Sequence, residues 1–352
     1  MMLKRLAAAL LCLLLIFAVG CGKKPADSSE PDTSSEVAPV VKPVEKPVLN
    51  PLTGEKLDNK EAINNRPVAV MVNNISIAQP VQCGLVDADI VYETEVEGGI
   101  TRLMAVYQDV ASVDRIGPVR SARYPYIDLA MGHNAIYLHA GQDPNYAAPH
   151  LKDLDDADLL QKNWGKRISN GLASEHTLYT FGKTLWDGLS NSGWKTESTS
   201  NEAWQNFADE ETDVQLSGSC LSVKVPFSNS YSTVMQYDAT TGRYNRFFGN
   251  TQRKDYQTKK NVSVKNVFVL LTTISDYPDG YHRRVALQDG TGYYCVNGTY
   301  TPILWSKGNA KNGFTFTNAD GSPLQVATGN SWVCIADKNM SQPIFTGEEP
   351  TE

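Results

Sequence analysis

From about Cys220 onward, the chain consists of short runs of β-branched and aromatic residues separated by turn signals. The turns include Asp289-Gly290, Asn297-Gly298 and Asp320-Gly321, which are dipeptides that strongly favour β-hairpins. Closely spaced strands of this kind must pair with one another to satisfy their backbone groups. The pattern predicts an all-β domain over residues 216–341, in the form of a curled sheet or a small barrel.

The first half follows a different pattern, in which short apolar strands are interleaved with helices. We expect strands over 66–74, 90–92, 103–107 and 135–139, and helices over 124–131, 151–162 and 183–193. Alternation of this kind is typical of a mixed α/β layer structure. The predicted fold is therefore an α+β or mixed α/β domain over residues 50–215, followed by the all-β domain.

The N-terminus carries an export signal. Lys4 and Arg5 precede an uninterrupted apolar stretch over 6–18, and small residues then lead up to Cys21. The apolar stretch is short for a membrane span and typical of a secretory signal peptide, here residues 1–20. Small residues directly before a cysteine predict cleavage there and lipidation of Cys21, with ordinary signal cleavage as the alternative. Lipid chains would then anchor the chain to the membrane.

The composition limits the classes of partner. Residues 21–49 are rich in Pro, Ser, Glu and Lys, which predicts a disordered tether, and residues 342–352 form an acidic tail. Lys and Arg total 32 against 39 Asp and Glu, a net charge of −7, so the overall basic footprint of a nucleic-acid-binding protein is missing. The 41% hydrophobic content indicates a globular body.

Four cysteines remain besides Cys21 in the exported chain, namely Cys83, Cys220, Cys295 and Cys334. An exported protein permits a disulfide, whereas cysteines inside apolar strands are also common as buried thiols, and the sequence leaves both open. No Cys-x-x-Cys or His-Glu-x-x-His motif occurs. We therefore expect neither a metal nor a cofactor.

Four arginines surround the predicted strand 103–107. Arg102 precedes it, and Arg115, Arg120 and Arg123 follow in a segment that contains Gly117-Pro118 and leads into the predicted helix 124–131. Guanidinium groups and the free N–H groups of a helix start are suited to hold an anion, above all phosphate. The alternative is ion pairing with the many nearby carboxylates, which requires no function.

Five further side chains are candidates for the same ligand site: Ser121, Glu93, Glu97, His139 and His176. Ser121 lies between two of the arginines, and the two glutamates belong to an acidic stretch before a Gly-Gly pair. His139 ends a predicted strand, where functional side chains are common. Both histidines have an alternative interpretation as satisfied polar residues near the core.

The same motifs resemble those of a known family. The matching segments are 66–72, 88–93, 97–102, 115–123, 127–130, 139–141 and 176–180, with looser matches at 305–307 and 331–332. They resemble the YerB-like family of bacterial lipoproteins, the two-part domain of unknown function 3048. Asn73 and Glu175 depart from the aspartate and proline expected there. The resemblance implies an extracytoplasmic lipoprotein. The arginines around a strand are also faintly similar to the LytR-CpsA-Psr family, whose arginines hold the pyrophosphate of a polyprenyl-linked glycan.

These observations predict a lipoprotein on the extracytoplasmic face of a bacterial membrane, held there through Cys21. It would be a cell-envelope binding or scaffold protein with an arginine-lined site for phosphate or glycan. Its partners would be cell-wall assembly proteins or an anionic envelope polymer, and not nucleic acid. The alternative is an enzyme acting on phosphorylated or glycan cell-wall substrates, with the arginines as an electrostatic clamp and Glu93, Glu97 or His139 as acid or base.

Overall fold

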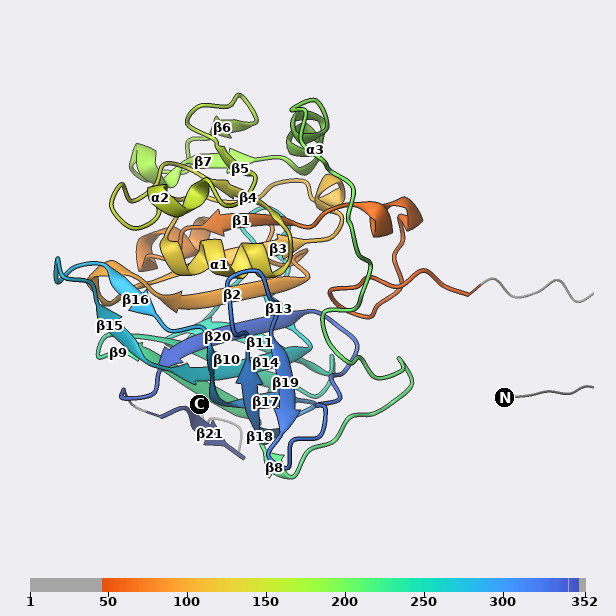
Figure 1. Ribbon diagram of the computed structural model, residues 1–352. Coiled ribbons are helices and arrows are strands. Elements are labelled where there is room, and N and C mark those ends of the chain that lie inside the picture. The colour runs from red at the N-terminus through yellow and green to blue at the C-terminus, as the bar shows by residue number, and fades with distance from the viewer. Residues whose placement is uncertain (1–45, 341, 348–352) are drawn as a thin grey trace, which may run out of the picture. The chain divides into compact units, whose positions relative to one another are not determined.

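The computed structural model describes residues 46–340 and 342–347 (Figure 1). The predicted signal peptide, the lipidation site at Cys21 and most of the predicted tether lie outside the described residues, as does the end of the acidic tail. Within the described part, Val48 and Leu49 already hydrogen-bond or pair with residues 56–57.

The largest sheet has eleven strands and contains segments from both halves of the sequence. In spatial order they are β19 (Thr315–Asn318), β18 (Thr299–Ser306), β17 (Asp289–Val296), β14 (Asn266–Thr272), β20 (Ser331–Asp337), β2 (Ile90–Glu95), β3 (Thr101–Tyr107), β1 (Val68–Val72), β4 (Ile136–His139) and β5 (Asp156–Asp158), with β8 (Gly218–Ser219) paired to β18. The halves meet where β2 runs parallel to β20, with Ile90 opposite Ser331. The predicted division near residue 215 stays a prediction, and the two halves share this sheet.

A second, six-stranded sheet lies against the first. It contains β12 (Thr251–Gln252), β11 (Arg243–Phe248), β10 (Tyr231–Asp238), β9 (Ser222–Ser228) and β21 (Ile344–Thr346), with β13 (Ser263–Val264) paired to β11. Two small hairpins complete the strands, β15 (Ile274–Asp276) with β16 (Arg283–Val285) and β6 (Gly165–Arg167) with β7 (Leu178–Thr180). No sheet in the described part of the chain closes, so the predicted small barrel is not found, and the strands after Cys220 are divided between the shared large sheet and this second sheet.

Helices are few. The α-helices are α1 (Tyr124–Gly132), α2 (Ala148–Leu151) and α3 (Gly182–Ser190), and the short 3₁₀ turns are η1 (Lys60–Asn64), η2 (Ser76–Val81), η3 (Glu97–Gly99), η4 (Val110–Ser112) and η5 (Ser174–His176). Helix α1 lies across the face of the large sheet that is turned to the viewer in Figure 1. It starts with Pro125 in its first turn, where the missing N–H costs nothing.

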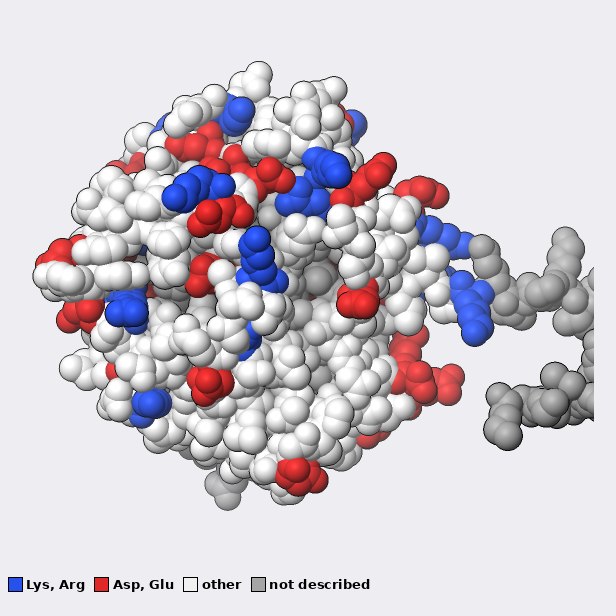
Figure 2. Space-filling model, in the orientation of Figure 1, with Lys and Arg blue, Asp and Glu red and all other residues white. Residues whose placement is uncertain are grey.

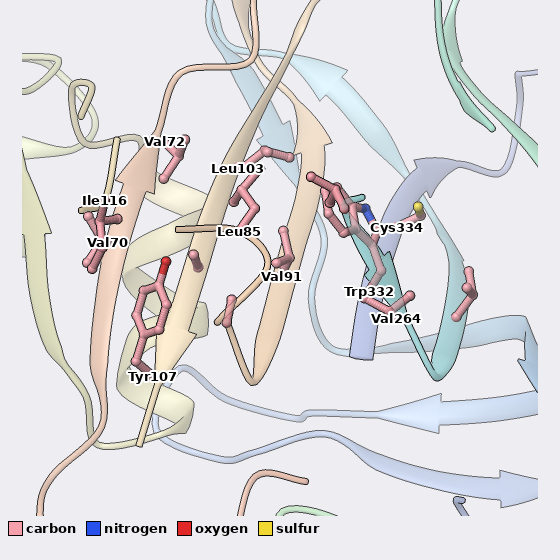
Figure 3. Packing of buried hydrophobic residues seen from close by; sticks show 14 of the residues in the cluster. Val70, Val72, Leu85, Val91, Leu103, Tyr107, Ile116, Val264, Trp332 and Cys334 are labelled. Carbon is pink, nitrogen blue, oxygen red and sulfur yellow. The ribbon is translucent and has the colours of Figure 1, made fainter. Parts of the chain in front are cut away.

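The central strands are buried on both faces, and their side chains alternate between two cores. Along β1, Val68, Val70 and Val72 contribute to one core, and Ala69 and Met71 contribute to the other. The first core fills the space between the two sheets, and Figure 3 shows its residues around β1, β3, β2 and β20. The second core lies beneath α1. Such double burial explains why these strands are continuous apolar runs in the sequence.

Most predicted elements are confirmed, including the strands at 66–74 and 103–107 and the helices at 124–131 and 183–193. The predicted helix over 151–162 is wrong, because α2 ends at Leu151 and the chain then enters the edge strand β5. Asp158 gives the physical reason. Its carboxylate accepts the backbone N–H groups of Gly141 and Leu160, a competing interaction that Asp offers in place of a helix.

All four cysteines of the described part are buried free thiols. Of the two possibilities that the sequence left open, the structure therefore contains the thiols and no disulfide among these residues.

Candidate anion-binding site

A tight turn brings the first arginine beside a carboxylate. Strand β2 passes through η3 into β3, and Gly98 and Gly99 have φ of 72° and 68°. Residues with a Cβ rarely adopt this conformation, so the Gly-Gly pair is what allows so short a connection. As a result, Arg102 at the start of β3 lies next to Glu97, with 3.3 Å between Nη2 and Oε1.

The second arginine motif runs in an extended path across the ends of several strands. Single β-bridges pair Val119 with Val72 and Ala122 with Gln142. Arg115 lies near Cys83 and the ring of Tyr179, whereas Arg120 contacts Glu175. The motif therefore delivers Arg120 and Arg123 to one place and leaves Arg115 at another.

Glu97 is the central carboxylate of the site. Nε of Arg123 donates to Oε2 at 2.8 Å, and Nη2 of Arg123 donates to Oε1. Arg102 approaches the same oxygen, Oε1. Burial opposes ionisation of Glu97, but the hydrogen bond from Arg123 and the charges of both arginines outweigh it and lower the Glu97 pKa to about 2. Glu97 is thus a fixed anion shared by two guanidinium groups.

Arg102 is buried, and the fold uses its donors. Its Nη1 donates to the backbone carbonyl of Ser121 at 2.8 Å, which ties β3 to the second arginine motif. Burial and the positive charge of Arg123 lower the Arg102 pKa to about 10, although Glu97 acts in the opposite direction. Arg102 therefore remains charged at neutral pH and positions the Ser121 backbone.

Arg120 is the least satisfied of the three neighbouring arginines. Its Nη1 donates to the backbone carbonyl of Glu175 at 3.2 Å, and its buried Nε has no partner. Burial lowers the Arg120 pKa, with repulsion from Arg123 adding to the effect and Glu175 and Glu97 opposing it. Among the described residues no carboxylate forms an ion pair with this guanidinium. Arg120 is therefore a charged group with unused donors.

His176 stands next to Arg120 as an oriented, uncharged donor. The amide Nδ2 of Asn73 lies 2.7 Å from its Nδ1. Because an amide nitrogen can only donate, Nδ1 accepts, and Nε2 carries the proton. Burial, followed by the charge of Arg120, lowers the His176 pKa, so the ring is neutral at pH 7. Nε2 lies 3.9 Å from the exposed Glu175.

Three predicted site residues lie apart from this group. Arg115 stacks on Tyr179 and Phe181, with its guanidinium carbon 5.7 and 5.8 Å from the ring centroids. His139 is fully buried, and its ring nitrogens contact the Gly141 carbonyl at 2.9 Å and Asp156 at 2.8 Å. Both ring nitrogens of His139 are thus engaged by the fold.

The third is Glu93, which lies in the core between the two sheets with no exposed surface. Its carboxylate accepts hydrogen bonds at 2.7–3.0 Å from the side chains of Asn74, Thr101, Thr233 and Trp332. The buried Arg246 lies 3.9 Å away. Glu93 therefore forms a polar cross-link between the two sheets. Neither Arg246 nor Asp156 was identified from the sequence, because their partners are distant along the chain.

The structure thus brings together Glu97, Arg102, Arg120, Ser121, Arg123 and His176, and places Arg115, Glu93 and His139 elsewhere. Two guanidinium groups contact the central carboxylate of Glu97, and Arg120 lies near Glu97 and Glu175, so three arginines stand against two glutamates and one positive charge is in excess. Donors without acceptors are suited to an incoming oxyanion. Within residues 46–340 and 342–347, no group of three or more His, Cys, Asp or Glu side chains is placed to hold a metal ion.

Comparison with known proteins shows two adjoining matches. Residues 52–195 match the family described as "Protein of unknown function (DUF3048) N-terminal domain", and residues 223–333 match its C-terminal domain. The "Putative lipoprotein YerB" of Bacillus subtilis is 28% identical, with 99% of each chain covered. The crystal structure of that YerB protein superimposes with a TM-score of 0.70, covering 82% of this chain and 96% of the other. None of the described helices is long and apolar enough to cross a bilayer.

Proposed function

Because the chain belongs to the YerB-like family of lipoproteins, we propose that it is anchored to the membrane through Cys21 and binds an anionic, phosphate-bearing component of the cell envelope. The binding site is the group formed by Arg120, Ser121, Arg123 and His176. Arg102 and Glu97 hold this group in place. The partner is then an anionic envelope polymer, or an assembly protein that carries such a polymer.

The observation that carries this proposal is the state of Arg120. Its guanidinium has neighbours of like charge, no carboxylate ion pair and a buried Nε without an acceptor. A buried donor without a partner costs free energy, and a phosphate oxygen would satisfy it while relieving the repulsion from Arg123. The neutral His176 Nε2–H adds a donor beside it. Arg123 is already bound to Glu97 and supplies mainly charge.

Binding is favoured over turnover by the same contacts. An acid or base must be free to exchange a proton with the substrate. His139 has both ring nitrogens engaged, Glu93 is enclosed in the core, and Glu97 is held ionised by two arginines. The three candidate catalytic groups therefore all have structural partners.

Titration calorimetry with pyrophosphate and inorganic phosphate tests the proposal on the full-length protein in a zwitterionic detergent. The wild type should bind pyrophosphate, and Arg120→Ala should weaken binding at least about tenfold, because hydrogen bonds to charged groups contribute roughly 1.5–3 kcal/mol. The affinity should also fall as salt is raised, since the site is at the surface.

Arg115→Ala is the matched control, since it removes an arginine of the same motif that contacts the rings of Tyr179 and Phe181 instead of the anion-binding group. It should leave the pyrophosphate affinity unchanged. Equal losses in both variants, or no pyrophosphate binding by the wild type, would rule out an anion site centred on Arg120.

A further inference from the structure

A separate pocket of about 280 Å³ lies at the other end of α1 from the anion-binding site. It is enclosed by the segment near Leu52, the C-terminal end of α1 at His133, and the loop that contains Thr199 and Trp204. Figure 2 shows the hollow on the viewer's face, beside that end of α1. The loop is held by backbone hydrogen bonds from Ser198 to Asn64 and from Trp204 to Pro51, so the wall of the pocket is part of the fold.

The inner wall contains an acceptor without a donor. Gln108 is 2% exposed, and its Nε2 donates to the backbone carbonyls of Ala62 and Asn65 at 2.7 and 2.8 Å. These two carbonyls fix the orientation of the amide, because the reverse orientation would set oxygen against oxygen. The Gln108 Oε1 is buried and unpaired. It requires a ligand or water that donates a hydrogen bond.

Two donors belong to the same pocket. The buried indole Nε1 of Trp204 has no acceptor. His133 lies 5.9 Å from that indole, and its Nε2 is 2.7 Å from the hydroxyl of Tyr92. Burial, aided by the charge of Lys307, lowers the His133 pKa to about 3, so the ring is neutral. The buried Tyr92 hydroxyl has no other acceptor among the described residues, so we assign it as the donor to Nε2, which places the His133 proton on Nδ1.

The charges at the pocket balance, because Glu202 and Lys311 both line it. The lining also includes the hydroxyls of Ser198, Thr199 and Ser200, and apolar surface from Leu52 and Met131. An uncharged ligand that both donates and accepts hydrogen bonds, and that has apolar C–H faces, fits this lining. Saccharides have this chemistry. We propose that the pocket at the C-terminal end of α1 is a binding site for a neutral saccharide.

A second pocket adjoins the first and offers room for a further sugar unit. It has a volume of about 590 Å³ and is lined by four of the same residues, Met131, Asn134, Thr199 and Lys311. Helix α1 has nine residues and spans about 13 Å, which separates this site from the arginines at its start. The saccharide site is therefore independent of the anion-binding site.

Saturation-transfer NMR and calorimetry with chitotetraose, cellotetraose and maltotetraose test the proposal, on the full-length protein in a detergent without a sugar headgroup. At least one of these should bind. Trp204→Phe keeps an aromatic ring and removes the unpaired N–H together with part of the surface of the larger indole ring. It should weaken binding roughly three- to tenfold, the effect of one hydrogen bond. Its thermal midpoint should fall by no more than a few degrees, because Nε1 makes no bond in the folded chain and only part of the ring packing on Phe268 and Phe316 is lost.

Trp194→Phe removes an indole N–H from a different pocket and is the control that should bind as the wild type does. Thr199→Trp fills the opening and should abolish binding while the protein stays folded. The proposal is overturned if none of the three saccharides binds the wild type up to about 10 mM. It is overturned equally if Trp204→Phe and Thr199→Trp both bind like the wild type.

Discussion

At the scale of single residues, Glu97 determines how the arginines are arranged. It forms hydrogen bonds with Arg123 and Arg102. Arg120 has no bond to Glu97, and its guanidinium donates only to a backbone carbonyl. From the sequence, ion pairing and an anion site were alternatives for all four arginines. In the structure the roles are divided among them. Two arginines pair with a carboxylate, Arg115 stacks on aromatic rings, and Arg120 lies beside the paired arginines; the Nε of Arg115 and that of Arg120 are both unpaired.

The Glu97 pairs should make stability depend on pH in the acid range. Its pKa falls from 4.5 to about 2 on folding, so its contribution is fully present above pH 4.5 and is lost as the pH falls through about 2. At pH 7, Glu97→Gln should lower the free energy of unfolding by about 2 kcal/mol, because it removes charge-assisted hydrogen bonds. Urea unfolding at pH 7 and at pH 3 should show the difference from wild type shrinking at the lower pH.

Asp187→Asn is a suitable control for this series. It breaks the exposed pair of Asp187 with Lys183 on α3, which should contribute no more than about 0.5 kcal/mol. A Glu97→Gln effect equally small, or one that grows as the pH falls, would mean that the two arginines do not depend on this carboxylate.

At the scale of elements, a polar cluster joins the two sheets. Glu93 on β2 accepts from Thr233 on β10 and from Trp332 on β20, with Arg246 of β11 over the indole ring at 4.8 Å. The sequence predicts the strands well, because each is an apolar run with a local period. It does not predict this cluster, since Glu93 and Thr233 are 140 positions apart and nothing local marks them as partners.

Glu93→Gln should therefore destabilise the protein without touching the ligand site. The glutamine amide can accept only at its oxygen, so its NH₂ group would face the donors of Thr233 or Trp332. Arg246 would also lose the negative charge beside it. The expected loss is about 3–5 kcal/mol, as for breaking other buried pairs. Chemical unfolding measures it, and pyrophosphate affinity under native conditions should be unchanged. A loss of pyrophosphate affinity with unchanged stability would instead mean that Glu93 contributes to ligand binding.

All four cysteines of the described part are buried, Cys295 in β17, Cys334 in β20, and Cys83 and Cys220 in segments between strands. Burial raises the Cys83 pKa to about 12 and the Cys295 pKa well above its ordinary value, so both thiols are protonated and poorly reactive. Thiol labelling of the native protein should be slow. After denaturation without reductant, Cys83, Cys220, Cys295 and Cys334 should all react. Two unreactive cysteines under those conditions would indicate a disulfide.

At the scale of the whole molecule, the strongest sequence signals were the export signal and the family motifs. The family is confirmed by the comparisons, whereas the signal peptide and Cys21 lie outside the described residues. The boundary between an α/β and an all-β half was drawn from local pattern alone. Local pattern cannot show that β2 and β20 would pair, because parallel pairing of distant strands leaves no mark on either segment.

The proposed anchor makes a simple prediction. Cys21→Ser removes the acylated thiol, and the chain should then leave the membrane fraction, since its net charge of −7 gives no attraction to anionic lipid. Fractionation of cells that express wild type or variant measures this. A Cys21→Ser chain that stays in the membrane fraction would require another means of attachment.

The central claim is that the Arg120 guanidinium takes up an anion. The most direct measurement is the side-chain Nε–H NMR signal of Arg120, assigned by comparison with Arg120→Lys and followed during titration with pyrophosphate. The Nε–H groups of Arg120 and, to a smaller extent, Arg123 should shift in a saturable way, while that of Arg115 stays in place. Shifts that are absent, linear without saturation, or as large at Arg115 as at Arg120 would contradict the account.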